Sequence, residues 1–255
     1  MAVRVAEADA PWALPVLYRD AVLAVVDKPN GLMAHASPMA RGESDFALDR
    51  LRRQFGADVF LAHRLDRATS GCLLVAFDRG IAAELGRAFM ARGVDKTYLA
   101  LCRGWPEARF SVDHPLDGGP GKPEKKPALT HFERLATAEL PVPTGGFETT
   151  RCSLLRCRPE TGRWRQIRRH LKHAMHHLVG DSSHGDGRRN RIARMQLGVH
   201  RMLLHAWQLG FAHPVSGARL VVTAPPDAEW RRLCERLGLD PALLDAAPMD
   251  GAAAP

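Results

Sequence analysis

A carboxylate between two arginines is the first feature of this sequence that could do chemistry. Residues 63–71 read HRLDRATSG, with Asp66 between Arg64 and Arg67 and a turn of small residues after it. Nearby cations can keep a carboxylate ionised and available as a nucleophile. The same spacing suits an Asx turn, in which Asp66 accepts amide hydrogens of the residues that follow it. Spacing alone leaves both interpretations open.

A tyrosine in a strand-like segment is the second candidate. The chain has only two tyrosines, and Tyr98 lies in KTYLALC (96–102), where apolar residues occupy alternate positions. Taken by itself, this pattern favours a buried strand tyrosine whose hydroxyl is hydrogen-bonded.

The third candidate is a basic segment, GRWRQIRRHL (162–171). Arg165, Arg168, Arg169 and Lys172 recur at helical spacing, so they could form a stripe that faces phosphates. The alternatives are an exposed charged helix, or an arginine from this group buried beside Asp66.

Histidines gather just after this segment. His173 and His177 are one helical turn apart, with Asp181 and His184 nearby, and such a pair could share a metal ion. The segment lacks the glutamate of an HExxH motif and has no neighbouring cysteine. We therefore expect no metal here, because histidines on an arginine-rich face more often contact phosphates or solvent.

The charge distribution indicates a polyanionic partner. The chain of 255 residues has a net charge of +8, and the window 151–194 alone holds twelve Lys and Arg residues against three acids. A concentrated basic block is typical of a phosphate-binding face.

Composition also restricts the cellular setting. No apolar run approaches the roughly 20 residues of a membrane-spanning helix, and acids and a proline interrupt the N-terminal stretch. Five cysteines without a CxxC pair fit a reducing, cytoplasmic location.

Hydrophobic periodicity predicts one domain of mixed strands and helices over residues 1–240, followed by a disordered Ala/Pro-rich tail at 241–255. The stretch 117–127 reads as a loop. Strands are predicted at 16–18, 21–27, 59–66, 70–77, 96–102, 128–135, 147–158, 199–211 and 218–223. Helices are predicted from a Ser44 cap to Gly56, from an Asp78 cap to Gly93, over 164–178 and over 228–238.

Five segments, in order, resemble the RluA-type pseudouridine synthase family, and the resemblance runs from about residue 15 to about residue 225. They are DKPNGLMAH (27–35), HRLDRATSG (63–71), KTYLALCRG (96–104), KPALTHFERL (126–135) and TGRWRQIRRHLKH (161–173). The resemblance implies an α+β fold with a mixed, largely antiparallel, bent sheet flanked by helices. It also implies an isomerase that converts uridine in RNA to pseudouridine without a metal or an organic cofactor.

The family motifs imply roles for individual residues. Asp66 matches the catalytic aspartate, which attacks either the sugar or the base, and Arg168 matches its arginine partner. Tyr98 is implied to lie over the uracil and to help move a proton. Because the uridine must leave its stack to reach such a site, Arg64 is implied to fill the space it vacates.

The resemblance is strongest to members that act on transfer RNA, which implies uridine 65 of tRNA as the target. We also expect a monomer. The basic block would then hold the RNA backbone. The residues assigned to this contact are Arg163, Arg165, Arg169, Lys172, Arg188, Arg189 and Arg191. The family usually has histidine at the position of Arg165, so we assign Arg165 a phosphate contact rather than a base contact.

Three other functions remain as alternatives. The first is a sister enzyme that modifies ribosomal RNA or another tRNA site. The second is an RNA-binding protein without catalysis, although Asp66, Tyr98 and Arg168 together argue against it because binding alone needs no such acid. The third is a metal hydrolase built on the histidines.

Overall fold

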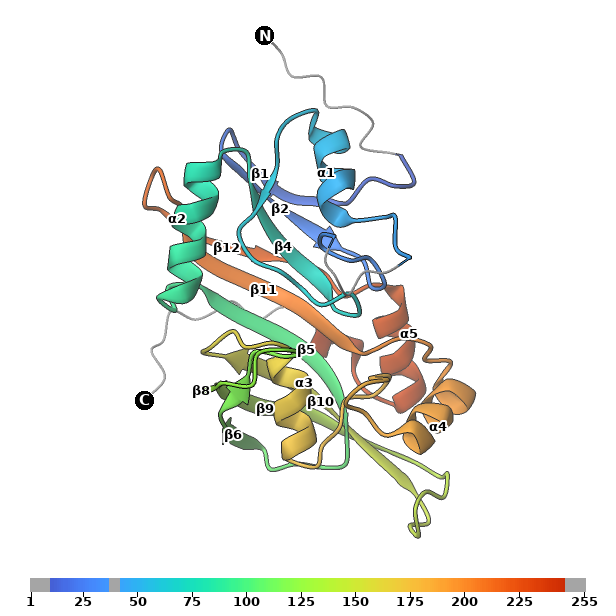
Figure 1. Ribbon diagram of the computed structural model, residues 1–255. Helices are drawn as coiled ribbons and strands as arrows, with labels where there is room; N and C mark the ends of the chain where they lie inside the picture. Colours follow the sequence, from blue (N-terminus) through green and yellow to red (C-terminus); the bar gives the residue numbers. More distant parts are fainter. Residues whose placement is uncertain (1–9, 37–41, 246–255) are drawn as a thin grey trace.

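A single large sheet carries most of the chain. The computed structural model describes residues 10–36 and 42–245. Within them, ten strands join in the order β1-β2-β4-β11-β5-β10-β9-β6, with β12 beside β11 and β3 beside β4 (Figure 1). Neighbours pair antiparallel except β4 with β11. The strands are β1 (Val16–Arg19), β2 (Leu23–Lys28), β3 (Phe60–Leu61), β4 (Ser70–Ala76), β5 (Asp95–Arg103), β6 (Arg109–Asp113), β9 (Leu129–Leu140), β10 (Thr150–Pro159), β11 (Leu204–Ala212) and β12 (Arg219–Thr223).

The parallel contact between β4 and β11 depends on a glycine. Gly71 has φ +107°, and a Cβ atom there would overlap the backbone carbonyl of Ala206 on β11. Only glycine combines this left-handed backbone with such a close approach. The glycine in the turn of small residues after Asp66 therefore allows β4 to pair with β11 in the middle of the sheet.

Capping residues set several helix boundaries. The helices are α1 (Ala47–Phe55), α2 (Arg79–Met90), α3 (Gln166–His173), α4 (Gly187–Leu197) and α5 (Ala228–Leu237). Asp78 caps α2 as predicted, by accepting the amides of Gly80 and Ile81. The predicted Ser44 cap of α1 is wrong, because the helix begins after Phe46 with no side-chain cap, although it ends at Gly56 as expected.

Other boundaries differ from the prediction. The helix expected over 164–178 is limited to α3, because Met175 takes a left-handed φ of 62° just after it, and Leu178 instead bridges to Cys102 on β5. Within the segment predicted as extended at 59–66, only β3 is a strand. The predicted loop at 117–127 contains a short hairpin of β7 (Leu116–Asp117) and β8 (Lys125–Lys126).

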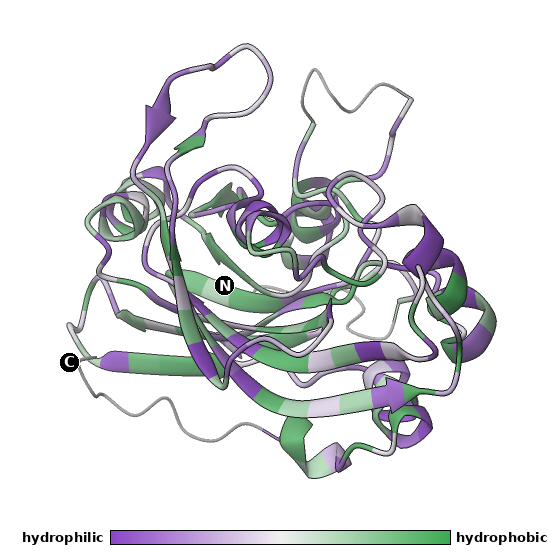
Figure 2. Ribbon diagram, turned by 90° about the horizontal axis from the view of Figure 1, so that it is seen from below, coloured by the Kyte–Doolittle hydropathy of each residue, from purple (hydrophilic) through white to green (hydrophobic). Residues whose placement is uncertain are grey.

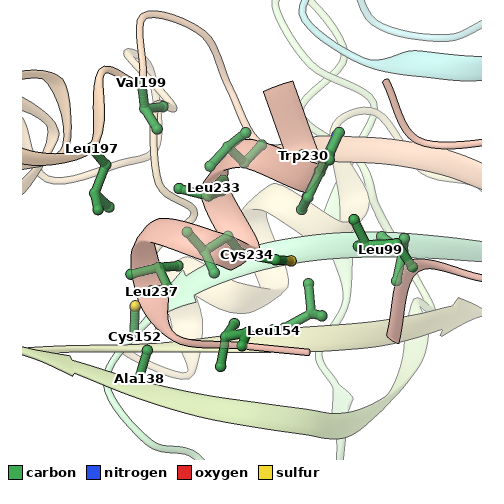
Figure 3. Packing of buried hydrophobic residues seen from close by; sticks show 14 of the residues in the cluster. Leu99, Ala138, Cys152, Leu154, Leu197, Val199, Trp230, Leu233, Cys234 and Leu237 are labelled. Carbon is green, nitrogen blue, oxygen red and sulfur yellow. The ribbon is translucent and has the colours of Figure 1, made fainter. Parts of the chain in front are cut away.

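Helices cover the sheet with their apolar residues. Figure 2 shows hydrophobic colour concentrated along the strands. In Figure 3, Trp230, Leu233 and Leu237 of α5 pack over Leu99 of β5 and Leu154 of β10. All five cysteines are buried and free, as a reducing environment would leave them.

The first residues of the predicted tail are structured. Residues Pro241–Leu244 form a 3-10 helix capped by Asp240, and Leu244 is buried against the α5 cluster. The prediction of disorder is therefore wrong for these residues, because Leu244 packs among buried apolar side chains. Residues 246–255 of the predicted tail lie outside the described residues.

Candidate active site

Asp66 and Arg168 meet in the structure although 102 residues separate them in the chain. Asp66 lies in the loop between β3 and β4, and its carboxylate accepts a hydrogen bond from Arg168 Nη1 at 2.7 Å. The Arg168 side chain on α3 is 5% exposed and that of Asp66 is 27% exposed. The amide of Thr69 donates to the backbone oxygen of Asp66 rather than to its carboxylate. Asp66 and Arg168 thus form an ion pair in which the arginine is buried and the carboxylate is partly exposed.

A second acid holds Arg168 from its other side. Asp181, 1% exposed, accepts from Arg168 Nε at 2.7 Å and from Nη2 at 2.8 Å. Burial alone would raise the pKa of Asp181, but the hydrogen bonds from Arg168 and from the amides of Ser183 and His184 keep that pKa below its ordinary value. The guanidinium therefore faces two carboxylates, and the group of three carries a net negative charge.

A buried lysine supports the Asp66 loop. The Lys28 ammonium donates to the carbonyls of Pro29 and Leu32 at 2.8 Å and to that of Arg67 at 3.3 Å. Burial lowers the pKa of Lys28 to about 7, against the opposing effect of Asp66 and Asp27.

The turn after Lys28 is hydrogen-bonded to the same loop. The Gly31 amide donates to the Arg67 carbonyl at 2.9 Å, and the Arg67 side chain donates back to Gly31. The Asn30 amide group donates to the Ala68 carbonyl. The segment DKPNG thus positions the backbone beside Asp66, a role that sequence reasoning missed. The signal available in the sequence was a lysine at the end of an apolar strand, directly before a Pro-Asn-Gly turn.

Tyr98 occupies the centre of the sheet. It lies on β5 between Cys157 of β10 and Ala206 of β11. Burial raises the pKa of its phenol well above the ordinary value, and the negative charge of Asp66 raises it further. The hydroxyl therefore stays protonated at neutral pH. No described residue is hydrogen-bonded to the Tyr98 hydroxyl. The strand pattern alone had favoured a buried tyrosine whose hydroxyl is hydrogen-bonded.

Arg165 borders the same site in an unusual backbone conformation. Its φ is 52°, left-handed for a residue with a side chain, directly before α3 begins. Such strain costs on the order of 1–2 kcal/mol and often marks functional positions. Its guanidinium lies 4.4 Å from the ring centroid of Trp164. Burial, followed by repulsion from Arg168, lowers its pKa, whereas Asp66 and Asp181 raise it.

The arginines and lysine assigned to RNA contact fall into two groups. Arg64, Lys172, Arg188 and Arg191 are exposed, and Arg163 and Arg165 are partly exposed. Two others are engaged within the protein. Arg169 forms an ion pair with Asp117 at an N–O distance of 2.6 Å, and its side chain is 16% exposed. Arg189 lies 3.6 Å from a carboxylate oxygen of Asp186, and its side chain is 14% exposed.

The histidines that follow α3 make protein contacts. The rings of His173 and His114 are stacked, with their centroids 4.0 Å apart. The buried His170 contacts the Thr130 hydroxyl and the carbonyl of His114. Among the described residues, no group of three or more His, Cys, Asp or Glu side chains is arranged to hold a metal ion.

Comparison with known proteins identifies the family of this chain. The family described as RNA pseudouridylate synthase matches residues 22–173, more than half of the chain, including Asp66, Tyr98 and Arg168. The chain belongs to this family. The resemblance to RluA-type pseudouridine synthases is thereby confirmed, and the protein is an isomerase that converts uridine in RNA to pseudouridine.

Curated relatives in the pseudouridylate synthase family extend over nearly the whole chain. The protein is 39% identical to tRNA pseudouridine synthase C of Vibrio parahaemolyticus over 92% of this chain and 99% of that one. It is 40% identical to the Vibrio cholerae protein of the same name, over 91% and 98%.

Solved structures confirm the pseudouridine synthase fold. Human RNA pseudouridylate synthase domain containing 1 superimposes with a TM-score of 0.66 at 27% identity, over 85% of each chain. Human RNA pseudouridylate synthase domain containing 4 superimposes with a TM-score of 0.68 at 23% identity, over 89% of this chain and 94% of that one. No helix among residues 10–36 and 42–245 is long and apolar enough to cross a membrane.

Proposed function

We propose that this pseudouridine synthase modifies tRNA, with uridine 65 as its target and Asp66 as its nucleophile. The observation that carries the proposal is the Asp66–Arg168 ion pair, in which the Asp66 carboxylate stays 27% exposed beside a guanidinium that is only 5% exposed. The tRNA assignment is supported by relatives named tRNA pseudouridine synthase C, which match over nearly their full length.

The proposed reaction is balanced within one nucleotide. The bond from uracil N1 to ribose C1′ breaks, the base turns, and a new bond forms between C5 and C1′. The hydrogen on C5 then leaves, and N1 carries a proton in the product. Asp66 attacks either the sugar or the base during this exchange, and a carboxylate can do so only while ionised. The protonated Tyr98 is suited to pack against the uracil and to assist the proton transfer.

Base flipping and backbone binding complete the proposal. Arg64 is exposed beside Asp66, with its guanidinium 3.3 Å from His35 Nε2, and it is suited to fill the space that a flipped uridine vacates. The exposed cations Lys172, Arg188 and Arg191 are suited to phosphate contacts. Arg169 and Arg189 are less suited to them, because both are paired with acids of the protein and their side chains are only 16% and 14% exposed. We further propose that the enzyme acts in the cytoplasm as a monomer without a metal or cofactor.

The decisive experiment maps pseudouridine with carbodiimide and reverse transcription in total tRNA and ribosomal RNA, from cells with and without this protein. We expect one lost signal, at tRNA position 65, and its return with wild type but not with Asp66→Asn. A lost ribosomal signal instead would keep the chemistry and overturn the tRNA assignment. Restoration by Asp66→Asn would overturn the nucleophile.

A binding measurement separates catalysis from recognition. Purified Asp66→Asn should bind a tRNA transcript as tightly as wild type but form no pseudouridine. An enzyme that binds tRNA yet leaves every uridine unchanged would support the binding-only alternative.

A further inference from the structure

A basic groove lies beside the candidate active site, between the β7–β8 hairpin and the segment just before α3. Its volume is about 440 Å³, and it is open to solvent. Its walls include the lysines Lys122 and Lys126 from the hairpin, and Arg163 and Trp164 from the other side. Trp164 was predicted to begin the helix over 164–178, but it precedes α3 and lines this groove instead.

The hairpin is fixed to the helix that carries Arg168. Arg169 Nη2 donates to the carboxylate of Asp117 at 2.6 Å, and Nη1 donates to the Asp117 backbone oxygen at 3.0 Å. The other carboxylate oxygen of Asp117 accepts the Gly119 amide at 2.9 Å. Gly119 lies so close to Trp164 that a Cβ atom there would be 2.8 Å from the indole. The hairpin that carries the two groove lysines is thus anchored to α3 at Arg169, the residue next to the partner of Asp66.

The chemistry of the walls suits an RNA backbone. Three cations line the groove, and its one acid, Glu124, lies 3.5 Å from Lys126. Arg163 uses its Nε for the Pro127 carbonyl, which leaves its terminal nitrogens available. The Arg165 guanidinium and Gly119 already contact the Trp164 ring, so the indole offers a partly covered apolar surface rather than a free face for a base. Phosphates can pair with the cations while a ribose packs against such a surface.

We propose that this groove binds the ribose–phosphate backbone of the substrate RNA next to the flipped uridine, with Lys122 and Lys126 as phosphate ligands. The inference rests on the proposed tRNA substrate and adds a contact outside the basic block of residues 151–194. Through Asp117 and Arg169, RNA held in the groove is linked to the helix that positions Arg168.

Neighbouring lysines on β8 provide a matched test. Lys126 lines the groove, whereas Lys125 is the adjacent residue on the same strand, does not line it, and is near enough to His114 to lower the pKa of that histidine. Successive strand residues face opposite sides, so Lys126→Ala and Lys125→Ala remove the same charge from different faces.

The measurement is the salt dependence of tRNA binding by the full chain. Each lost phosphate contact lowers the slope of log Kd against log salt by about 0.7–0.9. We expect this decrease for Lys126→Ala, roughly twice the decrease for Lys122→Ala with Lys126→Ala, and no change for Lys125→Ala.

Equal slopes for Lys126→Ala and Lys125→Ala would overturn the groove assignment while leaving the proposed function intact, provided wild type binds and modifies the same tRNA. If wild type neither binds nor modifies tRNA, the proposed function itself is overturned, and this inference with it.

Discussion

At the scale of single residues, the distinctive feature is an arginine shared by two acids. If Asp66 becomes covalently bound to the substrate, its negative charge disappears for that part of the reaction. Arg168 is buried, and a buried cation without a partner is strongly unfavourable. Asp181 supplies a counter-charge that does not depend on the state of Asp66, so the geometry of Arg168 can persist throughout the reaction.

We therefore expect Asp181→Asn to slow catalysis. The amide cannot balance the charge of Arg168, which then pairs more tightly with Asp66 and shifts from its position. A displacement of this kind lowers kcat by roughly 10- to 100-fold. Single-turnover pseudouridine formation at saturating tRNA measures this loss, and tRNA affinity should stay close to that of wild type.

Asp186→Asn is the matched control for this variant. Asp186 lies in the same connection and caps α4, but it pairs with Arg103 and Arg189 rather than with Arg168. Asparagine caps helices about as well as aspartate, so little change in kcat is expected. Equal kcat values for the two variants would show that Asp66 alone determines the position of Arg168.

The sequence could predict only part of this residue network. The family motifs placed Asp66 with Arg168, and the structure brings these two side chains together. The motifs carried no information on Asp181, which stands in the sequence as one acid among many arginines and histidines. Nothing in local spacing indicates a contact across 13 residues between a helix and the connection that follows it.

At the scale of elements, the most deeply buried strands were the easiest to predict. The segments that became β2, β4 and β11 are buried on nearly every side chain, so their composition indicates them, whereas the more exposed β6 was missed. Helix α4 was missed because its basic sequence GRRNRIARMQL has a weak apolar stripe, with only Ala193 and Leu197 buried. Its capping residues, Asp186 and Gly198, were the available signals.

The docking of the β7–β8 hairpin gives a prediction at this scale. Gly119→Ala introduces a Cβ atom 2.8 Å from Trp164 and should displace the hairpin from α3. We expect tRNA affinity to fall by about 1 kcal/mol, roughly 5-fold in Kd. Titration of tRNA monitored by filter binding measures the change.

Gly121→Ala separates displacement from backbone strain. Gly121 also has a left-handed φ, +74°, but an added Cβ atom there would meet nothing within 4 Å. The two variants therefore share the conformational cost of alanine and differ in the clash. A similar loss of affinity in both would contradict a role for hairpin docking.

At the scale of the whole molecule, a buried acid in β2 opposes stability at neutral pH. Asp27 Oδ1 is buried without a hydrogen-bond partner among the described residues. Burial, with a smaller contribution from the charge of Asp227, raises the pKa of Asp27 from 3.8 to about 6. Between these two pH values the folded state binds more protons than the unfolded state, so the free energy of unfolding falls as pH rises.

Asp27→Asn should remove this pH dependence. We expect the variant to be more stable than wild type by about 1–3 kcal/mol at pH 7.5, because asparagine carries no charge to bury. The difference should shrink toward zero only well below pH 3.8, where Asp27 is protonated in both the folded and the unfolded state. Urea unfolding across this range measures it, with the exposed Asp58→Asn as the control. A difference that does not change with pH would show that Asp27 does not titrate as described.

The parallel pairing of β4 with β11 has a consequence for biosynthesis. Ser70, four residues after Asp66, is joined to His205 of β11 by a hydrogen bond of 2.8 Å, and β11 also separates β4 from β5. A nascent chain that ends near residue 180 already contains Asp66, Tyr98 and Arg168, but it lacks the strand between them. Long-range strand pairing of this kind forms late, because its partners are far apart in the sequence. We therefore expect a nascent chain to modify RNA only after β11 has left the ribosome.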